Sequence, residues 1–314
     1  MQSRMFAFSA FTVGRLGVPI FMFITGYLLL DRDYDDKAII NFWKRNLLPL
    51  LATTEIWIVL YDIFLKFFYA QLFKWNVLIK NLLFLEQVKM GHMWYMSMVI
   101  GVYLFVPFVA RAIKNIRFNV VIMPFIIAAF YLSIIPLVNN ILIALKKMSI
   151  WPILNLDFSG GYYGLIFMAG YLYKRFVRID EINGYKAAIV GILSYGLVVG
   201  LQLFFFGKGL CYPVWYNWFP LLLAAASLAI VATKISRRFM KYDNKIVDNL
   251  GKCAFGVYLV HYPLLMALNK YCLWPGTMPV KVMSLFLASL TVSFTIVLVG
   301  ARSNKLKTIL FYIK

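Results

Sequence analysis

Two histidines are the residues of this sequence best suited to move a proton near neutral pH. His92 lies in GHMWYM, at the start of an apolar run, and His261 lies near the middle of another, FGVYLVHYPLL. Neutral histidine is the usual general base at pH 7. Both are therefore candidate catalytic residues, although a structural hydrogen bond inside a helix bundle explains His261 equally well.

Two adjacent cations stand at the mouth of the second apolar run, in NFWKRNLLPLL. Lys44 and Arg45 are candidates for binding an anionic co-substrate, because the arginine fork matches the geometry of phosphate oxygens. The alternative is simple anchoring of the span by basic residues at the membrane surface.

A third cation, Arg15, opens the apolar stretch RLGVPIFMFITGYLLL. A charge at the centre of a bilayer costs about 3 kcal/mol. Arg15 therefore either snorkels to the headgroups or faces the bundle interior, where it can contact a substrate.

Motifs for other chemistry are missing from the sequence. It contains no G-x-x-x-x-G-K-[ST] phosphate loop and no H-E-x-x-H zinc motif. With two histidines and three cysteines lacking C-x-x-C spacing, no metal site is expected. Cys211 and Cys272 are expected to pair only if both face outward.

The composition places these residues in membrane helices. Of the 314 residues, 63% are hydrophobic and 14% are charged, whereas soluble domains are near half apolar and a quarter charged. Apolar runs of about 20 residues fill the chain and predict an all-α, polytopic transmembrane helical bundle, a single membrane-embedded domain over residues 1–314. About nine spans are expected, at 16–30, 48–68, 93–110, 119–138, 161–175, 186–206, 214–233, 252–270 and 282–301.

Lys and Arg are distributed unevenly between the two sides that these spans define. One side holds 21 of the 32 Lys and Arg residues, in segments 31–46, 111–118, 174–186, 234–252 and 302–314. The positive-inside rule assigns this side to the cytoplasm, with residues 302–314 as a short basic cytoplasmic tail. The net charge of +20 thus requires no nucleic-acid partner.

Several stretches, in their order along the chain, resemble one family. RLGVPIFMFITGY resembles the signature R-x-x-V-P-x-F-x-x-x-[ST]-G-Y of the acyltransferase 3 family, which are integral-membrane O-acyltransferases. FWKRNLLPLL, HMWYMSMVIGVYLFVP, GGYYGLIFMAGYLY and GKCAFGVYLVHYPLL resemble later elements of that family. Each motif alone is weak, but the ordered set, from about residue 12 to residue 301, is specific.

The resemblance implies transfer of an acyl group, commonly acetyl from cytosolic acetyl-CoA, to a hydroxyl of an outward-facing envelope carbohydrate. Lys44 and Arg45 then lie inside, where the phosphates of the acyl-CoA co-substrate bind. Arg15, Trp94 and Asp157 lie outside as candidate contacts of the acceptor. Membrane lipid and envelope carbohydrate are the expected partners, without nucleic acid, in a bacterial plasma membrane with the C-terminus in the cytoplasm.

The resemblance also implies ten spans, the first carrying an arginine and, about ten residues on, the histidine held to be essential for acyl transfer. This chain starts where the second span of the family starts. We therefore expect an N-terminal truncation relative to the family, by start-site assignment or in the gene, or another histidine in that role.

Two other functions fit the same residues. A transporter or flippase of an anionic or glycolipid substrate would use Arg15, Glu55, Asp62 and His261 as its pathway. Substrate movement that does not depend on acyl-CoA would mark that function. An inactive truncated member of the family is the third alternative.

Overall fold

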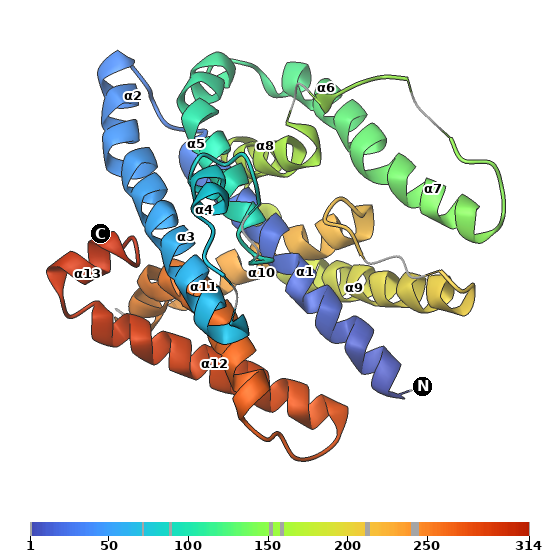
Figure 1. The fold of residues 1–314 in the computed structure, drawn as a ribbon. Coiled ribbons are helices and arrows are strands. Elements are labelled where there is room, and N and C mark those ends of the chain that lie inside the picture. Colours follow the sequence, from blue (N-terminus) through green and yellow to red (C-terminus); the bar gives the residue numbers. More distant parts are fainter. Residues whose placement is uncertain are drawn as a thin grey trace. The chain divides into compact units, whose positions relative to one another are not determined.

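The computed structural model describes most of the chain as helices (Figure 1). The described residues are 2–70, 72–87, 90–150, 153–157, 160–210, 214–239 and 245–313. These residues include no β-strand, so the predicted all-α fold is confirmed. Cys211, one partner of the conditional disulfide, lies outside the described residues.

The chain divides into two compact units, each assembled from two separate segments. The first unit comprises Met1–Asp33 and Phe108–Tyr242. Its helices are α1 (Gln2–Leu29), the end of α5 (Trp94–Ile113), α6 (Phe118–Ala129), η2 (Phe130–Ile134), α7 (Ile135–Ala144), α8 (Gly161–Phe176), η4 (Ile179–Glu181), α9 (Gly184–Gly207) and α10 (Phe219–Phe239).

The second unit comprises Tyr34–Pro107 and Asp243–Lys314. Its helices are α2 (Asp36–Phe42), η1 (Trp43–Leu47), α3 (Leu48–Tyr69), α4 (Trp75–Leu82), the greater part of α5, α11 (Lys245–Tyr271), α12 (Met278–Gly300) and α13 (Asn304–Ile309). The helices α2, η1 and α3 follow one another without a break.

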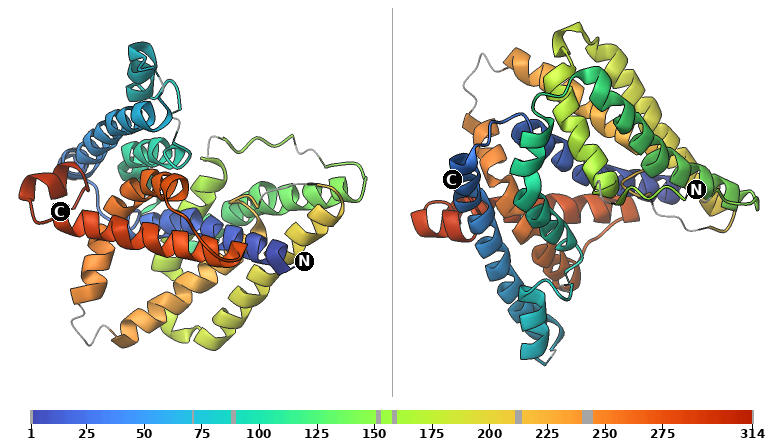
Figure 2. Two further views of the ribbon diagram at one scale, coloured as in Figure 1. Left: turned by 60° about the horizontal axis from the view of Figure 1, so that its bottom comes forward. Right: turned by 90° about the horizontal axis from the view of Figure 1, so that it is seen from above.

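In the first unit, α1 packs against α8 and α9 packs against α10 (Figure 2). Gly26 of α1 and Gly170 of α8 make the contact between α1 and α8 possible. A Cβ atom on Gly26 would lie 1.9 Å from the carbonyl oxygen of Phe167, and one on Gly170 would lie 2.0 Å from that of Phe23. The small residues at this contact therefore allow the two helix backbones to approach closely.

In the second unit, the core lies between α3, α5 and α11, with the chain's C-terminal segment against α3. Trp57 Nε1 donates to the carbonyl oxygen of Leu310 at 2.7 Å, and Thr53 Oγ1 donates to that of Ile309 at 3.0 Å. The segment predicted as a basic tail therefore contains a short helix, and its Phe311 side chain is buried in this core.

Eight described helical segments are long and apolar enough to cross a membrane. They are Arg4–Leu29, Asp36–Tyr69, Trp94–Ile113, Phe118–Ala144, Gly184–Gly207, Phe219–Arg237, Val247–Tyr271 and Met278–Gly300. The remaining predicted span, 161–175, forms α8, whose 16 residues extend about 24 Å, less than the roughly 30 Å hydrocarbon core. The chain is a multi-pass membrane protein.

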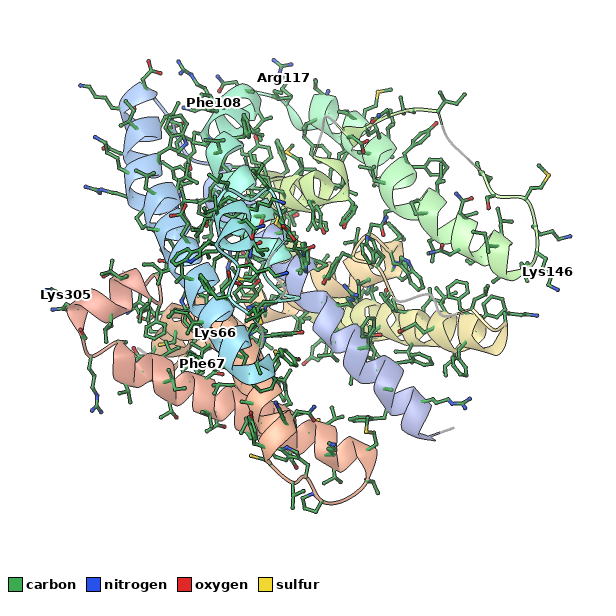
Figure 3. All side chains as sticks on the ribbon, in the orientation of Figure 1. Lys66, Phe67, Phe108, Arg117, Lys146 and Lys305 are labelled. Atoms are coloured by element: carbon green, nitrogen blue, oxygen red, sulfur yellow. The ribbon has the colours of Figure 1, made fainter. Side chains whose placement is uncertain are left out.

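Large apolar side chains cover the outside of these helices, as lipid contact requires. Phe67 is 78% exposed and Phe108 is 47% exposed, and both project outward from the helices that carry them (Figure 3). A soluble protein rarely exposes apolar area on this scale.

Candidate active site

The two histidines predicted to be catalytic lie side by side in the second unit. His92 occupies the turn that precedes α5, and His261 lies on α11. Their ring centroids are 5.3 Å apart. The sequence separates them by 169 positions, so the fold brings them together.

Three tyrosines from two helices surround His92. The Tyr262 ring stacks on the imidazole at 4.9 Å and 30°. Tyr258 donates its hydroxyl proton to the backbone carbonyl oxygen of His92 at 2.5 Å, and Tyr61 of α3 lies 3.1 Å from Nε2 of His92. These contacts hold both the backbone and the ring of His92.

The hydrogen bonds of Tyr61 determine which ring nitrogen of His92 carries the proton. Its hydroxyl oxygen lies 2.5 Å from the carbonyl oxygen of Leu259, which can only accept, so the single hydroxyl proton of Tyr61 points there. The 3.1 Å contact with His92 Nε2 then requires Nε2 to donate. His92 is therefore the neutral Nε2–H tautomer, and its Nδ1 carries a lone pair.

His261 is held in the opposite tautomer. Its Nδ1 lies 2.6 Å from the carbonyl oxygen of Tyr258 and 3.2 Å from that of Val257, one turn back along α11. Both partners only accept, so Nδ1 carries the proton and Nε2 carries the lone pair.

The environment of His92 keeps this lone pair available. Nδ1 is buried and has no hydrogen-bond partner among the residues that the structure describes. Burial lowers the pKa of His92 to about 3, and the nearby His261 lowers the pKa further as the second cause. His92 is therefore neutral at pH 7, and Nδ1 is a base without a competing hydrogen bond.

Lys44 and Arg45 lie in the π-helical segment η1, a helix type that often marks functional sites. Both side chains are exposed, and no described carboxylate pairs with either. Arg45 precedes Tyr61 on one continuous helix by 16 residues, or about 24 Å along its axis. The cations and the histidines are thus separated by most of the thickness of a hydrocarbon core.

Arg15 lies in the first unit within a group of aromatic rings. Its Cζ atom is 4.6 Å from the ring centroid of Tyr216, 4.8 Å from Phe11 and 5.6 Å from Trp215. Trp215 Nε1 in turn donates to the Tyr162 hydroxyl at 3.1 Å. No described carboxylate pairs with Arg15, so these rings are the neighbours that stabilise its charge.

The other two predicted acceptor contacts belong to different units. Trp94 starts α5, two residues after His92, and is half-buried. Asp157 is exposed in the loop before α8, where its backbone N–H donates to Asn155 Oδ1 at 2.8 Å. Asp157 belongs to the first unit with Arg15, whereas Trp94 belongs to the second with the histidines.

Tyr61, Tyr258 and Tyr262 are absent from the sequence-based set of site residues. Tyr258 precedes His261 by three positions, so helical spacing places both on one face of α11 and could have identified it. No sequence pattern connects Tyr61 of α3 with His92. Among the described residues no group of three metal-ligating side chains occurs.

Comparison with known proteins identifies the family of this chain. Residues 2–298 match the family model of the acyltransferase 3 domain. O-acetyltransferase OatA from Staphylococcus aureus strains NCTC 8325 / PS 47, COL and MRSA252 is 24% identical over 308 residues. The alignment covers 86% of this chain and 49% of each relative, so the chain spans about half the length of the curated relatives it matches.

No solved structure matches the chain. The family match extends over the segments that carry Arg15, the Lys44–Arg45 pair and both histidines. Because that match covers nearly the whole sequence, the chain belongs to the acyltransferase 3 family.

Proposed function

We propose that this protein is an O-acyltransferase that moves an acyl group, acetyl in the first instance, from cytosolic acyl-CoA to a hydroxyl of an extracytoplasmic carbohydrate. The observation that carries the proposal is the buried Nδ1 of His92, which has a lone pair and no described partner. Family membership and the relatives named as O-acetyltransferases support the same reaction class.

In this reaction His92 acts as the general base. Nδ1 takes the proton of the acceptor hydroxyl while the hydroxyl oxygen bonds to the acyl carbon. The carbon–sulfur bond of the thioester breaks, and the CoA thiolate leaves and recovers the proton from His92. Proton transfer of this kind contributes about 100- to 10,000-fold to a rate.

The rings around His92 offset part of the cost that burial imposes on its transient charge. Uptake of a proton gives a buried imidazolium, which is unfavourable in a low-dielectric site. Tyr262 stacks on it at 4.9 Å and Tyr61 and Tyr258 flank it. Aromatic faces stabilise a neighbouring cation by about 0.5–2 kcal/mol, and His261 offers a second proton acceptor.

Lys44 and Arg45 bind the phosphates of acyl-CoA on the cytoplasmic side. Their exposure and lack of a described carboxylate partner suit capture of an anion. The pantetheine arm of CoA separates its thioester from these phosphates. Phosphates held at Lys44 and Arg45 therefore leave the thioester free to reach into the bundle toward His92.

The outward-facing acceptor contacts Trp94, next to His92 in the second unit. Arg15 and Asp157 are separate candidate acceptor contacts within the first unit. Arg15 is surrounded by aromatic rings and has no described counter-ion. An acceptor oxygen can therefore act as the partner of its charge. The proposal places the protein in a bacterial plasma membrane, and the distribution of Lys and Arg supports a C-terminus in the cytoplasm.

The test is acyl transfer by membrane vesicles that contain this chain. Radiolabelled acetyl-CoA is supplied on the cytoplasmic face, and alkali-labile label is counted in the envelope glycan. The proposal predicts esterified glycan that depends on the chain and is lost in the double variant K44Q/R45Q. Movement of glycolipid across the membrane without any dependence on acetyl-CoA would instead support the transporter.

A further inference from the structure

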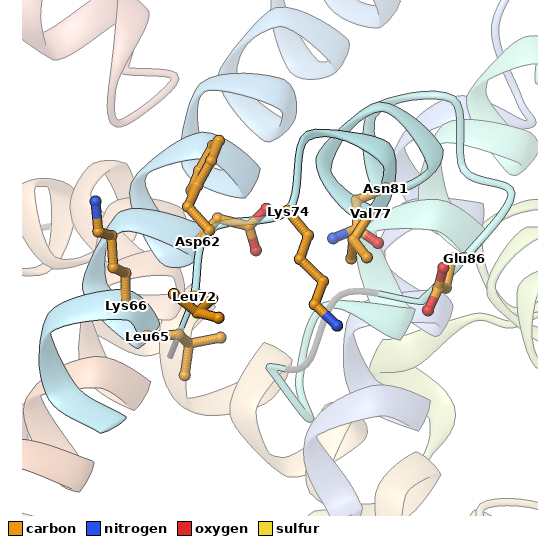
Figure 4. Close-up of a pocket in the computed structure, with 9 residues that line it drawn as sticks. Asp62, Leu65, Lys66, Leu72, Lys74, Val77, Asn81 and Glu86 are labelled. Carbon is orange, nitrogen blue, oxygen red and sulfur yellow. The ribbon is translucent and has the colours of Figure 1, made fainter. Parts of the chain in front are cut away.

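A second candidate ligand site lies between the end of α3 and the start of α4. It is a cavity of about 540 Å³ that both helices and the loop between them line, and we call it the α3–α4 cavity (Figure 4). Small-molecule sites typically have volumes of about 300–1,000 Å³. Its lining lies entirely within the second unit.

The lining combines charged groups with an apolar floor. Asp62 and Glu86 contribute carboxylates and Lys66 and Lys74 contribute ammonium groups, so the formal charge of the lining is balanced. The Lys74 side chain extends into the space between Asp62 and Glu86 (Figure 4). Such a lining offers both donors and acceptors, and it does not favour a polyanion such as CoA.

The apolar part of the lining includes Phe73, Leu65 and Val77. A sugar ring has faces of C–H groups and a rim of hydroxyls, so it can pack on an aromatic or aliphatic floor while its hydroxyls bond to the charged groups. A hydrocarbon chain would leave those groups desolvated without partners. The lining therefore favours an uncharged, hydroxyl-rich ligand.

Asn81 of α4 provides an independent indication of a ligand. Its side chain is 2% exposed, it borders the cavity, and its Oδ1 has no hydrogen-bond partner among the described residues. A buried amide oxygen normally has a partner. A ligand hydroxyl that enters the cavity beside α4 can donate to it.

The cavity lies close to the proposed catalytic histidine. Leu65 lines it and follows Tyr61 by one turn on the same face of α3, a rise of about 6 Å. Tyr61 accepts from Nε2 of His92 at 3.1 Å. A saccharide of several rings that fills the cavity can therefore extend its next hydroxyl toward His92.

We propose that the α3–α4 cavity binds an uncharged segment of the acceptor saccharide and presents the following sugar to His92. The proposal rests on the proposed O-acyltransferase function for the role of the ligand, although binding itself needs no acyl donor. It assigns recognition of the acceptor to Asn81, Lys74 and the Phe73 ring, none of which takes part in the proton transfer.

The test measures saccharide binding without acyl-CoA. The fully N-acetylated form of chitotetraose, an uncharged tetrasaccharide called chitotetraose below, is titrated calorimetrically into the purified full chain in lipid nanodiscs. Asn81→Leu, which removes the unpaired oxygen, is expected to weaken binding by at least about tenfold, the effect of losing one buried hydrogen bond. Asn76→Leu is the matched control, because Asn76 is exposed on the same helix and does not line the cavity.

Lys74→Gln keeps the test valid if Asn81→Leu does not fold, since Lys74 is exposed. It is expected to weaken binding severalfold, and free CoA is expected not to compete with chitotetraose. Absence of binding to the unaltered chain, or equal affinity in Lys74→Gln and the unaltered chain, would overturn the proposal. A third outcome is that the unaltered chain binds saccharide but transfers no acyl group, and that the variants lose the binding. This outcome would uphold the cavity as a saccharide site and reject the enzymatic function.

Discussion

Nδ1 of His92 is the atom on which the proposed reaction depends. Tyr61 fixes the proton on the opposite nitrogen, because the single hydroxyl proton of Tyr61 is directed to the Leu259 carbonyl oxygen. The base is therefore oriented before any substrate arrives. This arrangement avoids a tautomeric rearrangement during the reaction.

The opposite tautomers of the two histidines can be observed directly. The chain contains only these two histidines, so a sample labelled with ¹⁵N-histidine and carrying no histidine tag gives two ring systems. Long-range ¹H–¹⁵N spectra at pH 7.5 are expected to show Nε2–H for His92 and Nδ1–H for His261, with His261→Gln used for assignment. Nδ1–H at His92 would contradict the assigned base.

Stability should depend on pH through His92. The pKa of unfolded histidine is near 6.5, whereas burial lowers the pKa of His92 to about 3 in the fold. Between these values the unfolded state binds more protons, so the free energy of unfolding falls as the pH decreases from 6.5 toward 3. Thermal melts across this pH window should show a smaller decrease in melting temperature for His92→Gln than for the unaltered chain. An unchanged slope would reject the burial of a neutral His92.

The sequence predicts both histidines as candidate catalytic residues, because each is a rare titratable residue at or inside an apolar run. It does not predict their surroundings. Tyr61 reaches His92 only through tertiary packing of α3 against the turn before α5, and no local pattern encodes that contact. Asn81 is likewise an ordinary amide in the sequence, and only its burial without a partner distinguishes it.

Among the elements, α1 and α8 depend on glycine at their contact. Gly26→Ala would place a methyl group against the Phe167 carbonyl oxygen, and is expected to destabilise the protein by about 1–3 kcal/mol. Gly14→Ala on the same helix is the control, because nothing lies within 4 Å of its Cβ position. The measurement is the melting temperature in detergent. Equal melting temperatures for the two variants would contradict the close packing.

Most helices could be predicted from the sequence, because a helix that crosses the lipid must be an apolar run of span length. The short α8 was predicted as a span from its composition, yet its 16 residues are below the length of the eight spanning segments. Among the described residues between α3 and α5, only Trp75–Leu82 form a helix, the eight-residue α4. The contact of the C-terminal segment with α3 has no sequence signal. It includes a hydrogen bond from the Trp57 side chain to the backbone carbonyl of Leu310, and the two residues are 253 positions apart.

On the scale of the whole molecule, the unequal distribution of Lys and Arg predicts the orientation. In a Cys211→Ser/Cys272→Ser background, the exposed residues Asn155 and Lys305 are replaced by cysteine one at a time. A membrane-impermeant maleimide is expected to label Asn155→Cys in intact cells and Lys305→Cys only after permeabilisation. The reverse pattern would invert the proposed topology and with it the sides of donor and acceptor.

The most direct test of the proposed chemistry is the acetyl-transfer rate of His92→Gln. The glutamine amide can still donate to Tyr61, as Nε2 does, but its oxygen only accepts hydrogen bonds and is not basic enough to take the proton that Nδ1 takes. The initial rate of glycan ester formation in vesicles is expected to fall at least about 100-fold, with the melting temperature at pH 7.5 nearly unchanged. A folded His92→Gln variant that retains the unaltered chain's rate would contradict His92 as the base.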